Sequence, residues 1–213
     1  MGETVDAIAK RFRGRFLQGY VRGKLRGDPV YSAVFSRFRD VPGPVLDIGC
    51  GIGLLGQIVR EGGLALEVVG IDFDERKIAA ANEATEGIEG LRFELGDARK
   101  RREFAGSVVL LDLLHYFRDD EQREILENAA SYARPADVVI IRDCINDGSW
   151  RYRATWLEET FATSLGWLRG ERLNFPTADS ICSVFRQRGF DEEIVPMWGR
   201  TPFNNHLLTF RKR

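Results

Sequence analysis

The sequence predicts a doubly wound α/β fold with a seven-stranded, mainly parallel sheet. From residue 44 onward, short apolar runs rich in Val, Ile and Leu alternate with stretches of helical length. The runs are apolar throughout, as in strands that helices cover on both faces. The first run leads directly into a glycine-rich turn, and too few residues join the last two runs for a crossover helix. Those last two strands are therefore expected to pair antiparallel.

Length and composition indicate one globular domain. The chain has 213 residues, of which 44% are hydrophobic and 30% charged, a mix that supports a sizeable core. The net charge of -1 argues against a generic nucleic-acid binder, which is usually strongly basic. The three cysteines and two histidines show no metal-ligand spacing, so we expect no metal and a cytoplasmic location. No apolar run reaches the roughly 18 residues that span a bilayer, so we expect no membrane span.

Residues 1–43 are predicted to form an N-terminal helical cap or lid, ahead of a single folded α/β unit at 44–213. Nine Lys or Arg and four acids lie in residues 1–40, with aromatic and aliphatic residues at near-helical spacing. The segment is either a solvated helix face packed on the sheet or a cover whose Tyr20, Lys24 and Tyr31 touch the substrate. Both interpretations stay open.

The following elements are expected in chain order. Strands are predicted from the apolar runs at 44–49, 67–72, 91–96, 107–112 and 137–143, and from EEIVPMWG and NNHLLTFRKR near the C-terminus. Helices are predicted at 53–62, 74–86, 119–134, 150–168 and 177–188. Three acids open the helix at 119–134, where they suit the positive end of the helix dipole.

The stretch VLDIGCGIGLLG contains Gly49, Gly51 and Gly53 between the first strand and the first crossover helix. Glycines let the backbone approach a ligand closely, and the N–H groups of the helix start favour an anionic group. The stretch also has the dinucleotide spacing Gly51-x-Gly53-x-x-Gly56. That spacing alone fits a plain tight turn, an NAD site or a site for an adenosyl ligand.

Three acids favour the adenosyl ligand. Asp72 ends the second strand, where a carboxylate accepts hydrogen bonds from ribose hydroxyls. Asp97 follows the third strand and can accept from an adenine amine. Asp47 places a negative charge at the mouth of the glycine loop, which would repel a pyrophosphate and attract an ammonium and a sulfonium. The combination favours S-adenosylmethionine over NAD.

With these segments the sequence resembles the class I S-adenosylmethionine-dependent methyltransferases. The resemblance covers residues 44–143, through VLDIGCGIG, VVGIDFD, LGDAR and VVLLDLLHYF. It implies the strand order 3-2-1-4-5-7-6 with strand 7 antiparallel, and S-adenosylmethionine as cofactor. It also implies a set of cofactor-binding residues: Asp47, Gly49, Cys50, Gly51 and Gly53 around the methionine part, Asp72 at the ribose, and Phe73, Asp97 and Ala98 at the adenine. Asp112 and Leu113 are expected beside the methionine part, with capping of the next helix as the alternative role of Asp112.

Two residues after the fourth strand are candidates for catalysis. Methyl transfer is an in-line displacement that depends mainly on positioning, and a general base helps only where the acceptor is protonated. His115 is the candidate base, with Tyr116 beside it as a weaker candidate; the alternative is that His115 packs and shapes the pocket. Asp112, Asp143 and Asn146 lack the adjacent Asp-Asn pair of the magnesium-dependent relatives, so no metal is expected.

The acceptor is expected to be a small or carrier-bound molecule. Trp150, Arg151 and Asn204 lie in segments that should reach the strand-end face, where we expect substrate contacts. KLRGDPVY, GSWRYR, LNFPT and WGRTPFNN are similar to stand-alone methyltransferases among bacterial lipid and aryl-polyene pigment genes. That similarity suggests a phenolic or acyl-thioester acceptor. The alternatives are an NAD-dependent reductase and a non-catalytic S-adenosylmethionine-binding module.

Overall fold

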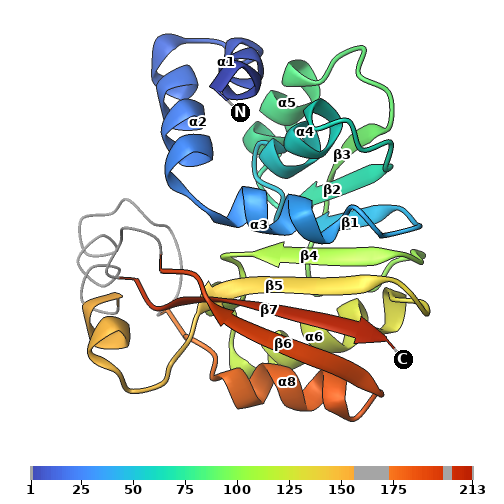
Figure 1. Ribbon diagram of the computed structural model, residues 1–213, viewed down its shortest axis with the longest axis vertical. Helices are drawn as coiled ribbons and strands as arrows, with labels where there is room; N and C mark the ends of the chain where they lie inside the picture. The colour runs from blue at the N-terminus through green and yellow to red at the C-terminus, as the bar shows by residue number, and fades with distance from the viewer. Residues whose placement is uncertain (1, 156–172, 199–202, 213) are drawn as a thin grey trace.

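A seven-stranded sheet in the order β3-β2-β1-β4-β5-β7-β6 forms the centre of the protein (Figure 1). The computed structural model describes residues 2–155, 173–198 and 203–212. The strands are β1 (Val45–Ile48), β2 (Val68–Asp72), β3 (Leu91–Leu95), β4 (Ser107–Leu111), β5 (Val138–Cys144), β6 (Phe190–Pro196) and β7 (Asn205–Lys212). Strand β7 runs antiparallel to both β5 and β6, and the other pairings are parallel. The predicted fold class and strand order are confirmed.

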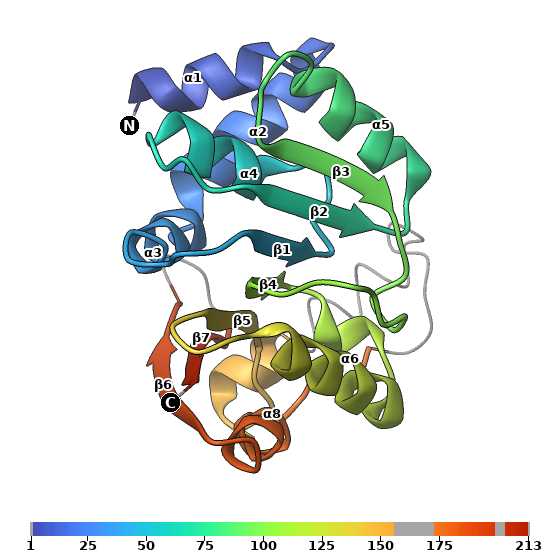
Figure 2. The same cartoon turned by 90° about the vertical axis from the view of Figure 1, so that its right-hand side faces the viewer.

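Helices cover both faces of this sheet. They are α1 (Gly2–Lys10), α2 (Arg15–Gly27), α3 (Val30–Arg37), α4 (Leu54–Glu61), α5 (Glu75–Ala84), the 3-10 turn η1 (Leu114–Tyr116), α6 (Asp119–Tyr132) and α8 (Ala178–Arg186). Helices α6 and α8 lie side by side in both views (Figures 1 and 2). Of the helix predicted at 150–168, residues 150–155 are helical, and the rest lies outside the described residues.

Successive side chains of a strand point to opposite faces of the sheet, so alternating residues pack into two separate cores. Leu46 and Ile48 of β1 join the core under α6 and α8. Val45 joins the opposite core, to which α1, α2, α3 and α4 contribute. Both cores are continuous across β4, β5 and β7. Among the described residues, none of the helices is both long and apolar enough to cross a bilayer.

The local sequence explains where the functional helices begin. The side chain of Asp74 accepts a hydrogen bond from the backbone N of Arg76 and caps α5. In α6 the side chain of Glu121 reaches back to the backbone N of Arg118, as in a capping box. Helix α2 belongs to the N-terminal segment, and its C-terminal half faces the carboxyl ends of β4 and β5, whose residues line the same cavity.

Candidate functional site

Acids stand at or just beyond the carboxyl ends of neighbouring parallel strands. Asp47 lies in β1, Asp72 ends β2, Asp97 follows β3 and Asp112 follows β4. Because these strands are adjacent in the order β3-β2-β1-β4, the four acids line up along one edge of the sheet. This edge is where open α/β sheets bind ligands.

The glycine loop after β1 leaves open space beside its backbone at one position, Gly51. Gly49, Gly51 and Gly53 all have positive φ, at 79°, 56° and 74°, a region that favours glycine. A Cβ at Gly49 would come within 2.9 Å of Leu113 Cδ1, and one at Gly53 within 2.6 Å of Phe93. A Cβ at Gly51 would meet no heavy atom of the described residues within 4 Å. Gly49 and Gly53 therefore serve packing, whereas Gly51 borders open space.

Asp72 fixes the glycine loop from the neighbouring strand. Its side chain is buried, with Oδ2 accepting from Gly51 N at 2.9 Å and Oδ1 accepting from Asp74 N at 2.9 Å. A carboxylate has about four acceptor sites, so each oxygen can accept a further hydrogen bond. The carboxylate therefore orders two loops and still has the capacity to hold a pair of hydroxyls.

Asp47 is a buried acid beneath the same loop, and its residue is only 3% exposed. Burial, helped by the negative charge of Asp72, raises the pKa of Asp47 to about 7. A ligand with a positive charge stabilises the ionised form of such a buried carboxyl group. Cys50, in the loop above it, is half-buried, and burial raises the pKa of its thiol well above the usual range. We therefore assign Cys50 no reactive role.

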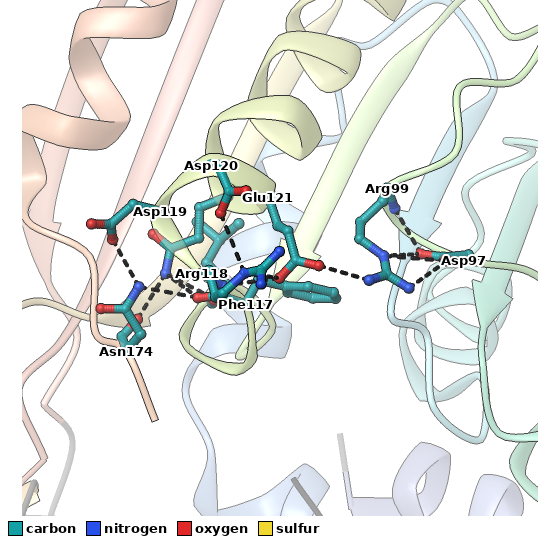
Figure 3. Close-up of polar contacts among 10 residues, drawn as sticks. Asp97, Arg99, Phe117, Arg118, Asp119, Asp120, Glu121 and Asn174 are labelled. Atoms are coloured by element: carbon teal, nitrogen blue, oxygen red, sulfur yellow. Dashed lines mark hydrogen bonds and ion pairs between the residues drawn. The ribbon is translucent and has the colours of Figure 1, made fainter. Parts of the chain in front are cut away.

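The carboxylate of Asp97, which the sequence predicts to contact adenine, is held by an arginine (Figure 3). Arg99 donates from Nη2 to Asp97 Oδ2 at 2.8 Å and from Nε to Oδ1 at 3.0 Å. Its hydrogen bonds lower the pKa of Asp97. The Nη1 of Arg99 donates to Glu121 at 2.7 Å, which joins this carboxylate to the start of α6. Phe73 nearby is 77% exposed, and Ala98 is partly buried against the core.

Beyond β4 a partly buried cluster of charges joins helix α2 to the sheet. Arg142 of β5 donates to Asp28 at 2.9 Å and forms an ion pair with Asp112. Lys24 of α2 lies 2.9 Å from Asp28 and 3.7 Å from Asp112. Burial raises the pKa of Asp112 against the opposing pull of Arg142 and Lys24. Asp112 also has a φ of 55°, a strained backbone conformation for a non-glycine residue of the kind that clusters at functional sites.

His115 is held by Asp143 at the end of β5. The ring Nδ1 lies 2.7 Å from Asp143 Oδ1, and the His115 residue is only 6% exposed. Asp143 is fully buried and also accepts from the backbone N of Leu114 and Cys144, each at 2.8 Å. The short contact with Asp143 Oδ1 fixes the orientation of the imidazole ring. Asp143 thereby ties both the His115 ring and the η1 turn to the sheet.

A cavity of about 440 Å³ opens between these groups. Its charged end includes Lys24, Asp112 and Arg142, and its other walls include His115, Tyr116 and several further aromatic residues. Of the residues predicted to bind the cofactor, only Asp112 lies among the described residues that line it. The cavity is therefore next to the strand-end edge and distinct from the glycine loop.

The other predicted substrate residues divide by position. The guanidinium of Arg151 lies 4.8 Å from the ring centre of Trp150 and 4.4 Å from that of Trp198, which lines the cavity. Tyr20 is 51% exposed on α2, whereas Tyr31 is buried in the core beneath α2 and α3. The Trp150–Arg151 pair thus lies beside a cavity-lining ring, Tyr20 is exposed on α2, and Tyr31 packs in the core.

Asn204 was expected to face the substrate, but it is buried and hydrogen-bonded within the protein. Its side chain is 1% exposed and donates from Nδ2 to the Ile145 carbonyl at 2.7 Å. Its backbone N donates to Thr155 Oγ1 at 3.1 Å. Asn204 therefore ties the end of β5 to the start of β7, and its neighbour Asn205 lines the cavity.

Two of the three side chains considered as magnesium ligands, Asp112 and Asp143, have protein partners. Asp112 pairs with Arg142, and Asp143 binds His115. Within residues 2–155, 173–198 and 203–212, no group of three or more His, Cys, Asp and Glu side chains is arranged to hold a metal ion.

The strand order, the ordered glycine loop and the acids at the strand ends define a class I methyltransferase fold. A family model described as a methyltransferase domain matches residues 19–193. The chain belongs to this methyltransferase family and is an S-adenosylmethionine-dependent methyltransferase. The NAD-dependent reductase considered from the glycine spacing is therefore not the function of this loop.

Solved structures share this fold at low identity. The magnesium protoporphyrin IX methyltransferase of Synechocystis PCC 6803, with bound SAH, is 19% identical with a TM-score of 0.68, covering 99% of this chain and 94% of that one. The PH0226 protein of Pyrococcus horikoshii OT3 is 19% identical with a TM-score of 0.67, covering 90% and 91%. An O-methyltransferase family protein of Burkholderia thailandensis is 20% identical with a TM-score of 0.70, covering 93% and 59%. Among proteins of curated function, none matches the sequence.

Sequence reasoning missed the partners of several predicted residues. Asp143 was considered only as a metal ligand, although it holds His115. Arg142 was read as part of an apolar strand, and Arg99 was not considered beside Asp97. The one available signal was a charged residue within or directly beside a strand end, where burial requires an opposite charge.

Proposed function

We propose that this methyltransferase acts on a small molecule that binds in the cavity beside Asp112 and His115. The position of the cavity carries the proposal, because it shares Asp112 with the predicted cofactor site and otherwise extends away from the glycine loop. A volume of about 440 Å³ is within the range of small-molecule sites. The aromatic walls suit the phenolic or acyl-thioester acceptor suggested by the sequence, whether free or carrier-bound. A nucleic-acid acceptor is not part of the proposal.

For the cofactor we propose the residues that the sequence singled out. Asp47 and the open space at Gly51 suit the charged methionine part, Asp72 suits the ribose, and Asp97 suits the adenine amine. Asp112 and Leu113 would border the methionine part from β4. When bound, S-adenosylmethionine supplies the methyl group and the sulfonium leaving group; the chain orients it against the acceptor. His115, held by Asp143, would take the proton of a phenolic acceptor.

Asp72→Ala tests the cofactor assignment. The variant should weaken adenosylhomocysteine binding by about 1–3 kcal/mol, because buried partners lose their acceptor. Isothermal calorimetry measures this, with Asp40→Asn as an exposed-acid control and NADH as the competing ligand. Unchanged affinity in a folded Asp72→Ala variant would remove Asp72 from the site.

A methyl-transfer assay decides between an enzyme and a non-catalytic binding module. The purified chain is incubated with labelled S-adenosylmethionine and a panel of phenols and acyl thioesters. Transfer to any member supports the proposal. Tight cofactor binding without transfer to the whole panel would favour the binding module.

A further inference from the structure

Helix α2 carries three glycines on one face, at Gly19, Gly23 and Gly27. The four-residue spacing puts them one above the other. Glycine is among the least favourable residues for a helix interior, so the presence of three glycines on this face calls for an explanation. A Cβ built at any of the three would meet no heavy atom of the described residues within 4 Å. Close packing against a neighbouring element in that part of the chain is therefore not the reason.

Two of the three glycines face the cavity. Gly23 and Gly27 line it, and Gly19 is not among its lining residues. The cavity walls also include Phe175, Met197 and Phe203. A helix face without side chains is flat, and together with these apolar and aromatic side chains it forms walls that suit a flat ligand.

Two cations, Lys24 and Arg142, line the same cavity together with the carboxylates of Asp28 and Asp112. Lys24, between the two glycines on α2, has Asp28 and Asp112 within 4.0 Å, and an ammonium group has three N–H donors. Arg142 is only 4% exposed and uses its terminal nitrogens for Asp28 and Asp112. Its buried Nε has no hydrogen-bond partner within the described ranges. Lys24 therefore retains donor capacity at the cavity, and Arg142, which also lines it, has a buried N–H donor without a partner among the described residues.

We propose that the cavity takes an acceptor with a flat, conjugated body that carries an anionic group. The body lies against the α2 face at Gly23 and Gly27, and the anion is held at the Lys24 and Arg142 end. Gly23 and Gly27 determine specificity by leaving the space that any side chain would fill. This inference rests on the proposed function, since it describes the acceptor side of the same site.

The test uses three probes of matched shape and charge on protein saturated with adenosylhomocysteine. The probes are 2-naphthoate, which is flat and anionic, 2-naphthamide, which is flat and neutral, and decahydro-2-naphthoate, which is anionic but thick. Calorimetry should show 2-naphthoate binding at least tenfold more tightly than either of the others. Absence of 2-naphthoate binding, or equal affinity for all three, would overturn the inference.

Two leucine variants on the same helix separate a pocket role from a helix role. Gly23→Leu should weaken 2-naphthoate binding at least tenfold, while Gly19→Leu leaves it unchanged. Both variants should raise the melting temperature, by about 2–4 °C for each kcal/mol of improved helix propensity. Lys24→Met should weaken 2-naphthoate at least tenfold and leave 2-naphthamide unchanged. Equal effects of Gly19→Leu and Gly23→Leu on binding would refute the assignment of the cavity wall.

The adenosylhomocysteine titration keeps the two proposals apart. If adenosylhomocysteine fails to bind the wild-type chain, the cofactor assignment is wrong and this inference falls with it. If adenosylhomocysteine binds and 2-naphthoate does not, the cofactor assignment stands and only the acceptor class is refuted.

Discussion

At the residue scale, the buried acid Asp47 couples stability to ligand binding. Its pKa of about 7 is raised from the ordinary value of about 4. Between these two values the folded chain binds more protons at this group than the unfolded chain does. The contribution of Asp47 to folding stability therefore falls as the pH rises from about 4 to 7, and the penalty is complete above that range.

Asp47→Asn should therefore stabilise the ligand-free protein at pH 8. We expect a gain on the order of 1–4 kcal/mol in the free energy of unfolding, shrinking towards zero near pH 4. Urea denaturation at pH 5 and pH 8 measures the difference. The same variant should bind S-adenosylmethionine more weakly, because a carboxylate facing a cation is lost. An Asp40→Asn control should change neither quantity, and a stability gain that is the same at both pH values would contradict the account.

The pair formed by His115 and Asp143 makes a second prediction at this scale. If His115 is the base, Asp143→Asn and His115→Gln should each slow methylation of a weakly acidic phenol by about 10² or more. Both variants should spare a nitrophenol acceptor that is already ionised at the assay pH. The measurement is the pH dependence of kcat/KM for the two acceptors. Equal losses for both acceptors would assign the pair to packing of the η1 turn, which Asp143 also holds through Leu114 N.

At the scale of elements, Arg99 connects the end of β3 to the start of α6 (Figure 3). It orients Asp97 and also binds Glu121, so we assign it a positioning role for adenine recognition. Arg99→Ala should weaken adenosylhomocysteine binding by about 1 kcal/mol, the usual worth of a hydrogen bond that is lost.

A comparison of two ligands that differ only in the base separates this positioning role from a general effect on stability. Arg99→Ala should affect binding of S-inosylhomocysteine less, because that ligand lacks the adenine amine that would donate a hydrogen bond to Asp97. Calorimetry with both ligands is the measurement, and Arg101→Ala is the matched control on an exposed arginine of the same segment. Equal losses for both ligands would show that Arg99 acts only on the fold.

The sequence was sufficient for the elements because their signals are local. Apolar runs located the strands, and the short link between the last two strands predicted the antiparallel pairing of β6 and β7. The partners of individual side chains are not local. Arg142 meets Asp28 across 114 residues, and His115 meets Asp143 across 28. Only the folded sheet brings these pairs together. The sequence therefore predicts which residues belong to the site but not which side chains they contact.

The same limit explains Asn204 and Gly23. An amide near the strand-end face is equally suited to bind a ligand or a backbone carbonyl. The position of Asn204 at the start of β7 brings its side chain to the Ile145 carbonyl. The glycines of α2 carry no side-chain signal of their own. Their role becomes visible only when Gly23 and Gly27 are found to line a cavity.

At the scale of the whole molecule, the N-terminal helices and the sheet share one core. Ile8, Phe12, Leu25, Val34 and Phe38 are buried in the same cluster as residues of β1, β4 and β5. Burying five such side chains contributes about 7–15 kcal/mol of favourable hydrophobic free energy, which residues 44–213 alone would lose. Residues 1–43, predicted as a cap or lid, are therefore expected to be part of the same folding unit as 44–213.

A fragment of residues 44–213 should consequently fail to fold. We expect it to lack a cooperative urea transition and the circular dichroism of the full chain, because the face that α1, α2 and α3 cover would be exposed to water. The control is the full chain cleaved at a protease site engineered into the Val41–Pro44 turn, which should keep both pieces associated with native circular dichroism. A fragment that unfolds cooperatively and binds adenosylhomocysteine like the full chain would instead identify residues 1–43 as a separable cap.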